Sequence, residues 1–421
     1  MLRVLAVLRA NRTRPVPERS ALFETRAGTL AGLVMALGVV ASLTACATLD
    51  RLPAVPLALA SEIQPLDIPY ARFYADGDPA ILEGLARETI ARRRAYLKGA
   101  GIRPKKEAAF LAISGGGDDG AFGAGLLVGW TSRGDRPEFL VVTGISTGAL
   151  SAPFAFLGPD YDHGLRSVYT ETKAEDIFVQ VSLLTAFEGE AATDTTPLRN
   201  LIARYVDHEM VRRIAEEHDK GRLLLIGTTN LDQARSVIWN IGAIAKSSDP
   251  RARELIIEVL RASASIPGAF PPVMLDVTVN GKRYEEMHVD GGATTQMFLY
   301  PPSLKLKRVE RDLGNHKDVA YIIRNGRLFR QEETVKRRTL AVASQAISTM
   351  IASNAVNDLY RIYLTTQRDD VAFNLAYLDK GFAVPYEGPF EKEYMNKLFA
   401  YGFRKGAEGY DWHNTPPGYA N

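Results

Sequence analysis

The sequence predicts a layered α/β fold, in which helices cover a mostly parallel sheet. The chain has 421 residues, of which 46% are hydrophobic, and this is enough apolar surface for a substantial core. Short apolar runs alternate along it with longer amphipathic or small-residue stretches. Glycine- and proline-rich segments separate the two kinds of run, and such alternation is typical of parallel strands that helices connect.

The elements expected from this pattern begin at residue 78. A helix is predicted over 78–98, since Asp78 is a good N-cap and proline is favoured at the first helical position, here Pro79. Asn280-Gly281, between two extended segments, is a strong signal for a hairpin turn. Strands are predicted over 108–113, 139–143, 223–227, 233–244, 273–279, 283–289 and 319–323. Further helices are predicted over 121–130, 147–157, 250–262, 333–364 and 390–403.

The first 45 residues have the features of a bacterial export signal. They contain six arginines and two glutamates, and an apolar run spans 30–43. Its 14 residues are fewer than the roughly 20 that span a membrane, and they suit the hydrophobic region of a signal peptide. The run ends in the sequence LTAC, which resembles a lipobox, so Cys46 is predicted to become the lipid-modified first residue. A short signal anchor and an ordinary signal peptide cut near Ala45 are the alternatives.

Cys46 is the only cysteine of the chain and cannot form an intramolecular disulfide. Alanine rather than aspartate follows it, which favours the outer membrane under the sorting rule for bacterial lipoproteins. We therefore expect a lipid-anchored protein of the bacterial cell envelope that faces the periplasm. The predicted organisation is a signal peptide over 1–45, a proline-rich tether and lead-in over 46–77, and a folded domain over 78–421 with a core at about 108–325 and a C-terminal helical extension at about 330–421.

Two classes of partner are not expected from the composition. Beyond residue 45 the chain holds 45 basic and 47 acidic residues, and it has no basic stripe with interleaved aromatic residues. Binding of nucleic acid is therefore not expected. His163, His208 and His218 lack the spacing of metal ligands, so no metal site is predicted. The sequence also predicts no cofactor.

The pentapeptide GISTG at 144–148 follows the apolar run 139–142 and precedes a small, apolar helix. This G-x-S-x-G pattern is typical of a tight strand-to-helix turn that exposes a nucleophilic serine at a helix N-terminus. Glycine at the flanking positions, Gly144 and Gly148, leaves room for the turn, so Ser146 is the candidate nucleophile. Glycine and serine are also common in ordinary turns, and the pattern needs support from other residues.

Two further glycine-rich segments lie on either side of this serine. The first, SGGGDDG at 114–120, separates a predicted strand from a helix, and its consecutive glycines can direct several N–H groups at one anion. A nucleotide-binding loop is the alternative, but the Gly-Lys-Ser/Thr ending is missing; a permissive turn is another. The second is HVDGG at 288–292, where Asp290 stands at the end of a strand, 144 residues beyond Ser146.

These three segments, together with ASASIPGAFPP at 262–272, resemble the patatin-like phospholipases from about residue 108 to 292. The resemblance implies a three-layer α/β/α sandwich and a Ser–Asp dyad, with Ser146 as nucleophile and Asp290 as its general base. It also implies an oxyanion hole formed by the backbone of Gly115, Gly116 and Gly117. The implied substrates are membrane lipids or other acyl esters, hydrolysed through an acyl-enzyme.

The chain departs from the family at Asp119, where the family usually has lysine or arginine. Asp118 precedes it, so two carboxylates stand at a helix start. They suit the helix dipole but would repel a negatively charged headgroup. This predicts a neutral or zwitterionic ester substrate, or a divergent subfamily.

Two other functions remain open on the sequence. A conventional Ser-His-Asp hydrolase would need a histidine after the acid, and His316 and His413 are the candidates. His288 shares a strand face with Asp290 and is interpreted as structural. The second alternative is a non-catalytic envelope lipoprotein that binds lipids or a partner protein. The region after Gly292 has no functional motif. Its small-residue stretch at 340–351 could cap the active site, form an interface or complete the core, and core packing is the default expectation.

Overall fold

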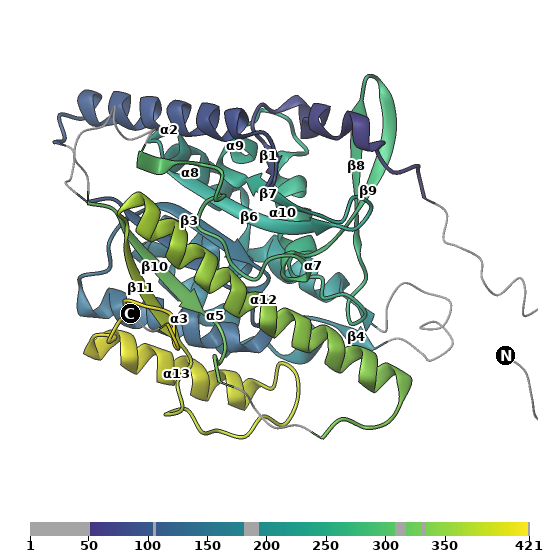
Figure 1. Ribbon diagram of the computed structural model, residues 1–421, viewed down its shortest axis with the longest axis vertical. Coiled ribbons are helices and arrows are strands. Elements are labelled where there is room, and N and C mark those ends of the chain that lie inside the picture. Colours follow the sequence, from purple (N-terminus) through teal and green to yellow (C-terminus); the bar gives the residue numbers. More distant parts are fainter. Residues whose placement is uncertain (1–50, 104–106, 181–192, 308–316, 330–333, 420–421) are drawn as a thin grey trace, which may run out of the picture. The chain divides into compact units, whose positions relative to one another are not determined.

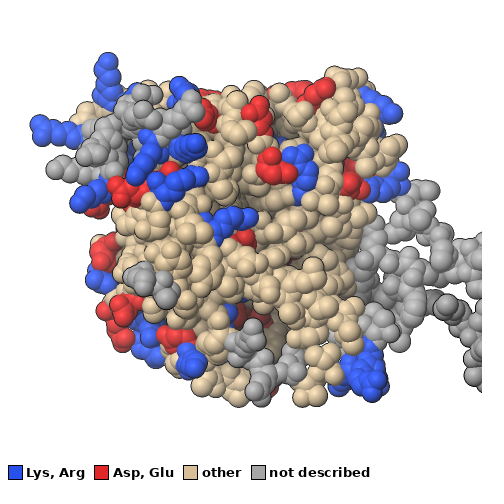
Figure 2. Space-filling model, in the orientation of Figure 1, with Lys and Arg blue, Asp and Glu red and all other residues tan. Residues whose placement is uncertain are grey.

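The computed structural model describes residues 51–421 apart from 104–106, 181–192, 308–316, 330–333 and 420–421 (Figure 1). The predicted signal peptide, Cys46 and His316 lie outside the described residues. Residues 51–421 form one compact unit, and charged side chains of both signs are scattered over the face seen in Figure 2. None of the helices in this part of the chain combines the length and the hydrophobicity that a membrane span requires.

Nine strands of the described chain form one mostly parallel sheet. They are β1 Arg72–Tyr74, β2 Ala109–Ile113, β3 Phe139–Ile145, β6 Leu223–Asn230, β7 Arg235–Asn240, β8 Val273–Val279, β9 Lys282–Asp290, β10 Val319–Arg324 and β11 Ala372–Tyr377. Their order is β1-β7-β6-β3-β2-β10-β11. The pairs β6-β3, β3-β2, β2-β10 and β10-β11 are parallel, whereas the pairs β1-β7 and β7-β6 at one edge are antiparallel. β9 pairs antiparallel with the end of β6, and β8 pairs with β9. A separate small sheet joins β4 Val179–Gln180 to β5 Thr193–Asp194.

Helices cover both faces of the large sheet, and this confirms the three-layer α/β/α sandwich (Figure 1). Alternate residues of β2 belong to the two cores: Leu111 to one and Phe110 to the other. The first core includes α3 Gly120–Arg133, α4 Thr147–Leu157, α5 Asp162–Thr170, α7 Thr196–Tyr205, α8 His208–Asp219, α9 Ile241–Ala245, α10 Ala252–Ser263 and α13 Lys392–Glu408. The opposite face is covered by α2 Pro79–Gly99 and α12 Thr339–Asp369. Short 3₁₀ helices are η1 Leu57–Glu62, η2 Pro65–Asp67, η3 Gly117–Asp119, η4 Pro159–Tyr161, η5 Ala174–Asp176 and η6 Gly291–Ala293.

The C-terminal helix α13 packs directly against the backbone of α3. A Cβ on Gly125 would lie 2.1 Å from the carbonyl oxygen of Phe399, and one on Gly402 would lie 2.2 Å from that of Phe122. Only glycine allows two helices to approach so closely. The small residues of the helix predicted at 121–130 are therefore explained by a partner helix that lies about 270 positions later in the chain.

Most predicted elements are confirmed with small shifts at their ends, and α4 begins and ends where it was predicted. Two predictions were wrong. The stretch 233–244 is not one strand, because the Asn240 side chain accepts a hydrogen bond from the N–H of Ala243 and caps α9. The stretch 340–351 is not core, since most of its described side chains are exposed. β1, β11 and helices α5, α7 and α8 were not predicted.

Candidate active site

Ser146 lies at a sharp turn between β3 and α4. Its φ is 55° and its ψ is −127°, which is strained for a residue other than glycine. A Cβ on Gly144 would lie 2.4 Å from the carbonyl oxygen of Gly148, and one on Gly148 would lie 2.3 Å from that of Ile113. Both glycines are thus required by close backbone contacts, as the G-x-S-x-G pattern predicted.

Ser146 and Asp290 meet because their two strands pair with the same edge of β6. Ile145, the last residue of β3, pairs with Gly227, and Asp290, the last residue of β9, pairs with the next residue, Thr228. The residue that follows Ile145 therefore lies beside Asp290. The side chain of Ser146 donates a hydrogen bond to the Asp290 carboxylate. The sheet thus brings together two predicted site residues that are far apart in the sequence.

The Asp290 carboxyl group is buried, and its pKa is raised from 3.8 to about 7. Burial is the cause, because the charged form loses its hydration; hydrogen bonds from Ser146 and from the N–H of Gly292 partly offset it. The Gly292 N–H donates to Oδ1 at 2.7 Å. A carboxyl group that titrates near neutral pH can accept a proton from a serine hydroxyl.

Two serines of the 262–272 segment hold the backbone of both residues. The N–H of Ser146 donates to Oγ of Ser263 at 3.0 Å, and this hydroxyl donates in turn to the carbonyl oxygen of Gly227 at 2.7 Å. The N–H of Asp290 donates to the carbonyl oxygen of Ser265 at 2.8 Å. This segment is part of the resemblance to the family, but these contacts of Ser263 and Ser265 were not predicted from the sequence.

The glycine loop lies against the serine. An added Cβ on Gly115 would lie 3.2 Å from Cβ of Ser146. The N–H of Gly115 already donates to the carbonyl oxygen of Gln296 at 3.1 Å. Within the described chain, no acceptor is seen for the N–H groups of Gly116 and Gly117. Those two groups are therefore the free donors of the loop, and they lie close to the N-terminus of α3.

Arg324, which the sequence did not single out, lies against this loop. It follows Ile323, which pairs with Ile113, so it stands beside Ser114 at the end of β10. Its Nη1 donates to Oγ of Ser114 at 3.1 Å and to the carbonyl oxygen of Gly115 at 2.6 Å. Burial lowers the pKa of the guanidinium to about 10, so it stays charged at neutral pH. Its position at the carboxyl end of a predicted strand was the one available signal.

Asp118 and Asp119 bind the C-terminal segment. Oδ2 of Asp118 accepts a hydrogen bond from the N–H of Phe390 at 3.0 Å, and Oδ1 of Asp119 accepts one from the hydroxyl of Tyr394 at 2.8 Å. Burial raises the pKa of both carboxyl groups, that of Asp118 to about 6. With Arg324 as a cation beside the loop, these carboxylates no longer give a reason to expect a neutral substrate.

No histidine in the described part of the chain hydrogen-bonds to Asp290. The Nδ1 of His288 lies 2.9 Å from the hydroxyl of Thr228, and its Nε2 lies 3.4 Å from Glu286. His413 forms a bridge with β11, which β10 and β2 separate from β3. Among the described residues, no group of three or more His, Cys, Asp or Glu could hold a metal ion.

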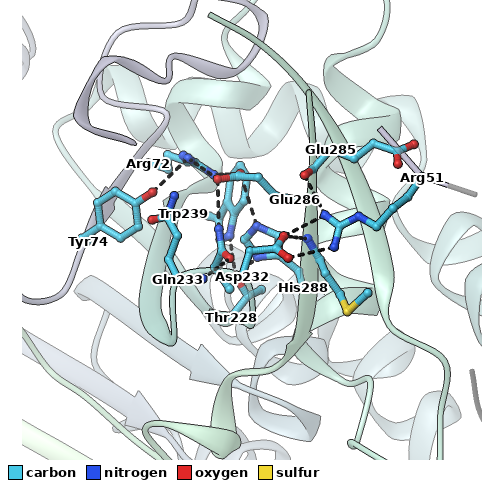
Figure 3. A network of polar contacts seen from close by, with 12 residues as sticks. Arg51, Arg72, Tyr74, Thr228, Asp232, Gln233, Trp239, Glu285, Glu286 and His288 are labelled. Atoms are coloured by element: carbon cyan, nitrogen blue, oxygen red, sulfur yellow. Dashed lines mark hydrogen bonds and ion pairs between the residues drawn. The ribbon is translucent and has the colours of Figure 1, made fainter. Parts of the chain in front are cut away.

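A buried polar network supports β9 just before Asp290 (Figure 3). The guanidinium of Arg72, from β1, binds both carboxylate oxygens of Glu286. Burial alone would raise the pKa of Glu286, but Arg72 and His288 outweigh it and lower the pKa to about 2. The interpretation of His288 as structural agrees with these contacts. The network ties the edge strand β1 to the strand that ends in Asp290.

A search of curated proteins found no significant match. Among solved structures, the chain is similar to VipD from Legionella pneumophila, at 12% sequence identity and a TM-score of 0.38. The similarity covers 72% of this chain and 66% of that chain, just under two thirds of its length.

The family model of patatin-like phospholipases matches residues 111–301, a little under half of the chain. The matched range contains the glycine loop, Ser146, the 262–272 segment and Asp290 in the order predicted. Residues 111–301 of the chain thus match a patatin-like phospholipase domain.

Proposed function

We propose that the protein is a lipid acyl hydrolase in which Ser146 and Asp290 form the catalytic dyad. The observation that carries the proposal is the buried hydrogen bond between the two side chains, with the pKa of Asp290 raised to about 7. The match of residues 111–301 to the patatin-like phospholipase domain supports the same class of reaction, because this domain implies lipid acyl ester substrates.

In the first half of the reaction, Oγ of Ser146 attacks the acyl carbonyl carbon while Asp290 takes the hydroxyl proton. The N–H groups of Gly116 and Gly117 would stabilise the oxyanion, and the N-terminus of α3 adds to the positive potential there. When the tetrahedral intermediate collapses, the ester C–O bond breaks and the leaving alcohol or lysolipid takes the proton from Asp290. Ser146 is then acylated.

In the second half, Asp290 takes a proton from water as the water oxygen attacks the acyl-enzyme. The bond between the acyl carbon and Oγ breaks, Ser146 regains its proton from Asp290, and the fatty acid leaves. Ser263 and Ser265 act as positioning residues because they bind the backbone N–H groups of the two dyad members.

We further propose that Cys46 is lipidated and that the enzyme works in the bacterial envelope, at the periplasmic face of the outer membrane. The LTAC sequence before a folded domain that starts near Arg51 supports this. Mass spectrometry of the membrane-extracted protein should find a diacylglyceryl-modified Cys46 at the N-terminus; an unmodified N-terminus at another residue would contradict it.

The dyad is tested by measuring hydrolysis of a short-chain ester and of phospholipid by matched variants. Ser146→Ala and Asp290→Asn should each lower turnover by about three orders of magnitude or more. His316→Ala and His413→Ala should keep activity close to that of the unmodified protein. Loss of turnover in one of the histidine variants would favour the conventional triad, and an inactive wild type would favour a binding lipoprotein.

A further inference from the structure

The first half of α12 exposes an apolar face. Val342, Ile347 and Met350 are 54%, 37% and 64% exposed. Successive residues of an α-helix are rotated by about 100°, so these three lie on one side, together with the exposed Ala343 and Ala346. An apolar surface of this kind usually marks a site of interaction.

This face points away from the sheet. Gln345 and Ser348 lie on the other side of the helix, so the segment is amphipathic. The residues through which α12 packs on the sheet come later, among them Ala355, Leu359 and Ile362. By the same rotation they lie roughly opposite the apolar face. The face is therefore not a continuation of the core.

Basic residues come immediately before this face. Lys336, Arg337 and Arg338 are all exposed, and Arg338 is the N-cap of α12. Cations at a helix N-terminus oppose the helix dipole, so helix stability does not explain them. Figure 2 shows few charged side chains along the course of α12, and a group of Lys and Arg side chains at the lower right, where Figure 1 shows the helix begin.

The face is also close to the active site. Oδ2 of Asp358, on α12, accepts a hydrogen bond from the N–H of Gln296 at 2.6 Å, and the carbonyl oxygen of Gln296 accepts one from Gly115. Met350 precedes Asp358 by eight residues, about 12 Å along the helix axis. The apolar face thus ends about two helical turns before Asp358, which Gln296 links to the glycine loop.

We propose that the first part of α12, together with the three cations that precede it at 336–338, forms a docking helix for a phospholipid bilayer that contains anionic lipids. The apolar face would enter the boundary between headgroups and acyl chains, while the three cations bind lipid phosphates. The choice of a bilayer over a protein partner rests on the proposed lipid acyl hydrolase function. Docking would bring Ser146 to the surface that supplies its substrates.

The lone cysteine makes a position-specific test possible. In full-length protein with Cys46→Ser and Ser146→Ala, a single new cysteine is labelled with an environment-sensitive fluorophore at Met350→Cys or, as the matched control, at Ser348→Cys. Vesicles of equal parts phosphatidylcholine and phosphatidylglycerol are added. We expect a several-fold rise and a blue shift of the emission at position 350 and little change at 348. Adding Lys336→Glu, Arg337→Glu and Arg338→Glu should reduce the response.

Equal responses at both positions, or none, would overturn the docking helix. A response at position 350 that depends on protein concentration without vesicles would also overturn it, because a second copy of the chain would then cover the face. The proposed function can be disproved independently of the docking helix. Hydrolysis of a soluble short-chain ester by the protein with Ser146 intact tests the dyad without a bilayer, whereas the fluorescence needs no catalysis.

Discussion

At the scale of single residues, the proposed catalysis depends on the protonation of Asp290. In the folded chain its pKa is raised from 3.8 to about 7, mainly by burial. The folded state therefore binds more protons than the unfolded state between these two values. The contribution of this group to stability is fully present below the unfolded pKa and falls as the pH rises toward 7. The same deprotonation is what makes Asp290 a base.

Asp290→Asn should therefore stabilise the protein while removing its activity. An amide has no charge to bury, and it can still accept the hydrogen bond from Gly292. We expect a gain of up to about 4 kcal/mol at pH 8, since a shift of about three pKa units corresponds to that free energy, and little gain at pH 4. Urea unfolding at both pH values measures it; a gain that does not depend on pH would contradict the burial of an ionised carboxylate.

Ser263→Ala should lower both activity and stability. The change leaves the N–H of Ser146 and the buried carbonyl oxygen of Gly227 without their partner, which costs about 1–3 kcal/mol. Ser265→Ala is the matched control, because that hydroxyl bonds only to the preceding turn of the same segment, at Arg261. Unfolding midpoints and kcat of the two variants are compared. Equal effects in both would show that Ser263 has no special role at the nucleophile.

The sequence predicted the residues whose patterns are local. A G-x-S-x-G turn fixes Gly144, Ser146 and Gly148 within five positions, because the backbone contacts that require glycine arise there. The roles of Ser263 and Arg324 depend on partners more than a hundred positions away. The register of the strands brings those partners together, and this register cannot be predicted from a local sequence pattern.

At the scale of elements, the contact of α3 with α13 explains why the C-terminal region is part of the domain. Gly402→Ala should destabilise the protein by about 1–3 kcal/mol, because the new Cβ meets backbone rather than a movable side chain. Gly99→Ala, at the end of α2, meets nothing within 4 Å and is the control. Equal unfolding free energies for the two variants would show that the helices separate easily.

The end of β10 supports the glycine loop through Arg324. Arg324→Met keeps much of the volume but removes the hydrogen bonds to Ser114 and Gly115. We expect kcat to fall at least tenfold with KM nearly unchanged, since the loop acts on the oxyanion rather than on the bound ester. Steady-state kinetics with a soluble ester measure both constants, and Arg324→Lys should recover part of kcat. A change in KM alone would instead assign Arg324 to substrate binding.

Helix α12 shows where element prediction fails. Its length was nearly right, but the small, apolar stretch 340–351 was expected in the core. Composition alone does not distinguish a face that packs on a sheet from one that remains uncovered. The later residues Ala355, Leu359 and Ile362 form the packed face, and the earlier ones extend past it. In the same way, composition did not distinguish β7 from the short helix that follows it. The predicted strand at 233–244 therefore ran on into α9, which Asn240 caps.

At the scale of the whole molecule, the sheet assembles the site. The carboxyl ends of β2, β3 and β10 bring the glycine loop, Ser146 and Arg324 to one edge, and β9 supplies Asp290 from the opposite direction. The family pattern predicted this assembly in outline. The contacts of Asp118 and Asp119 with the segment before α13 were not predictable, since that segment carries no motif.

The most direct test of the dyad is the reaction of Ser146 with a fluorophosphonate, followed by mass spectrometry at several pH values. The account predicts a single adduct on the peptide that contains Ser146. Its rate of formation should rise with pH to a plateau, with a midpoint near 7; Asp290→Asn should slow it by about a thousandfold on the plateau and remove the rise with pH. An adduct on another serine, or a rate at Ser146 that Asp290→Asn leaves unchanged, would contradict the account.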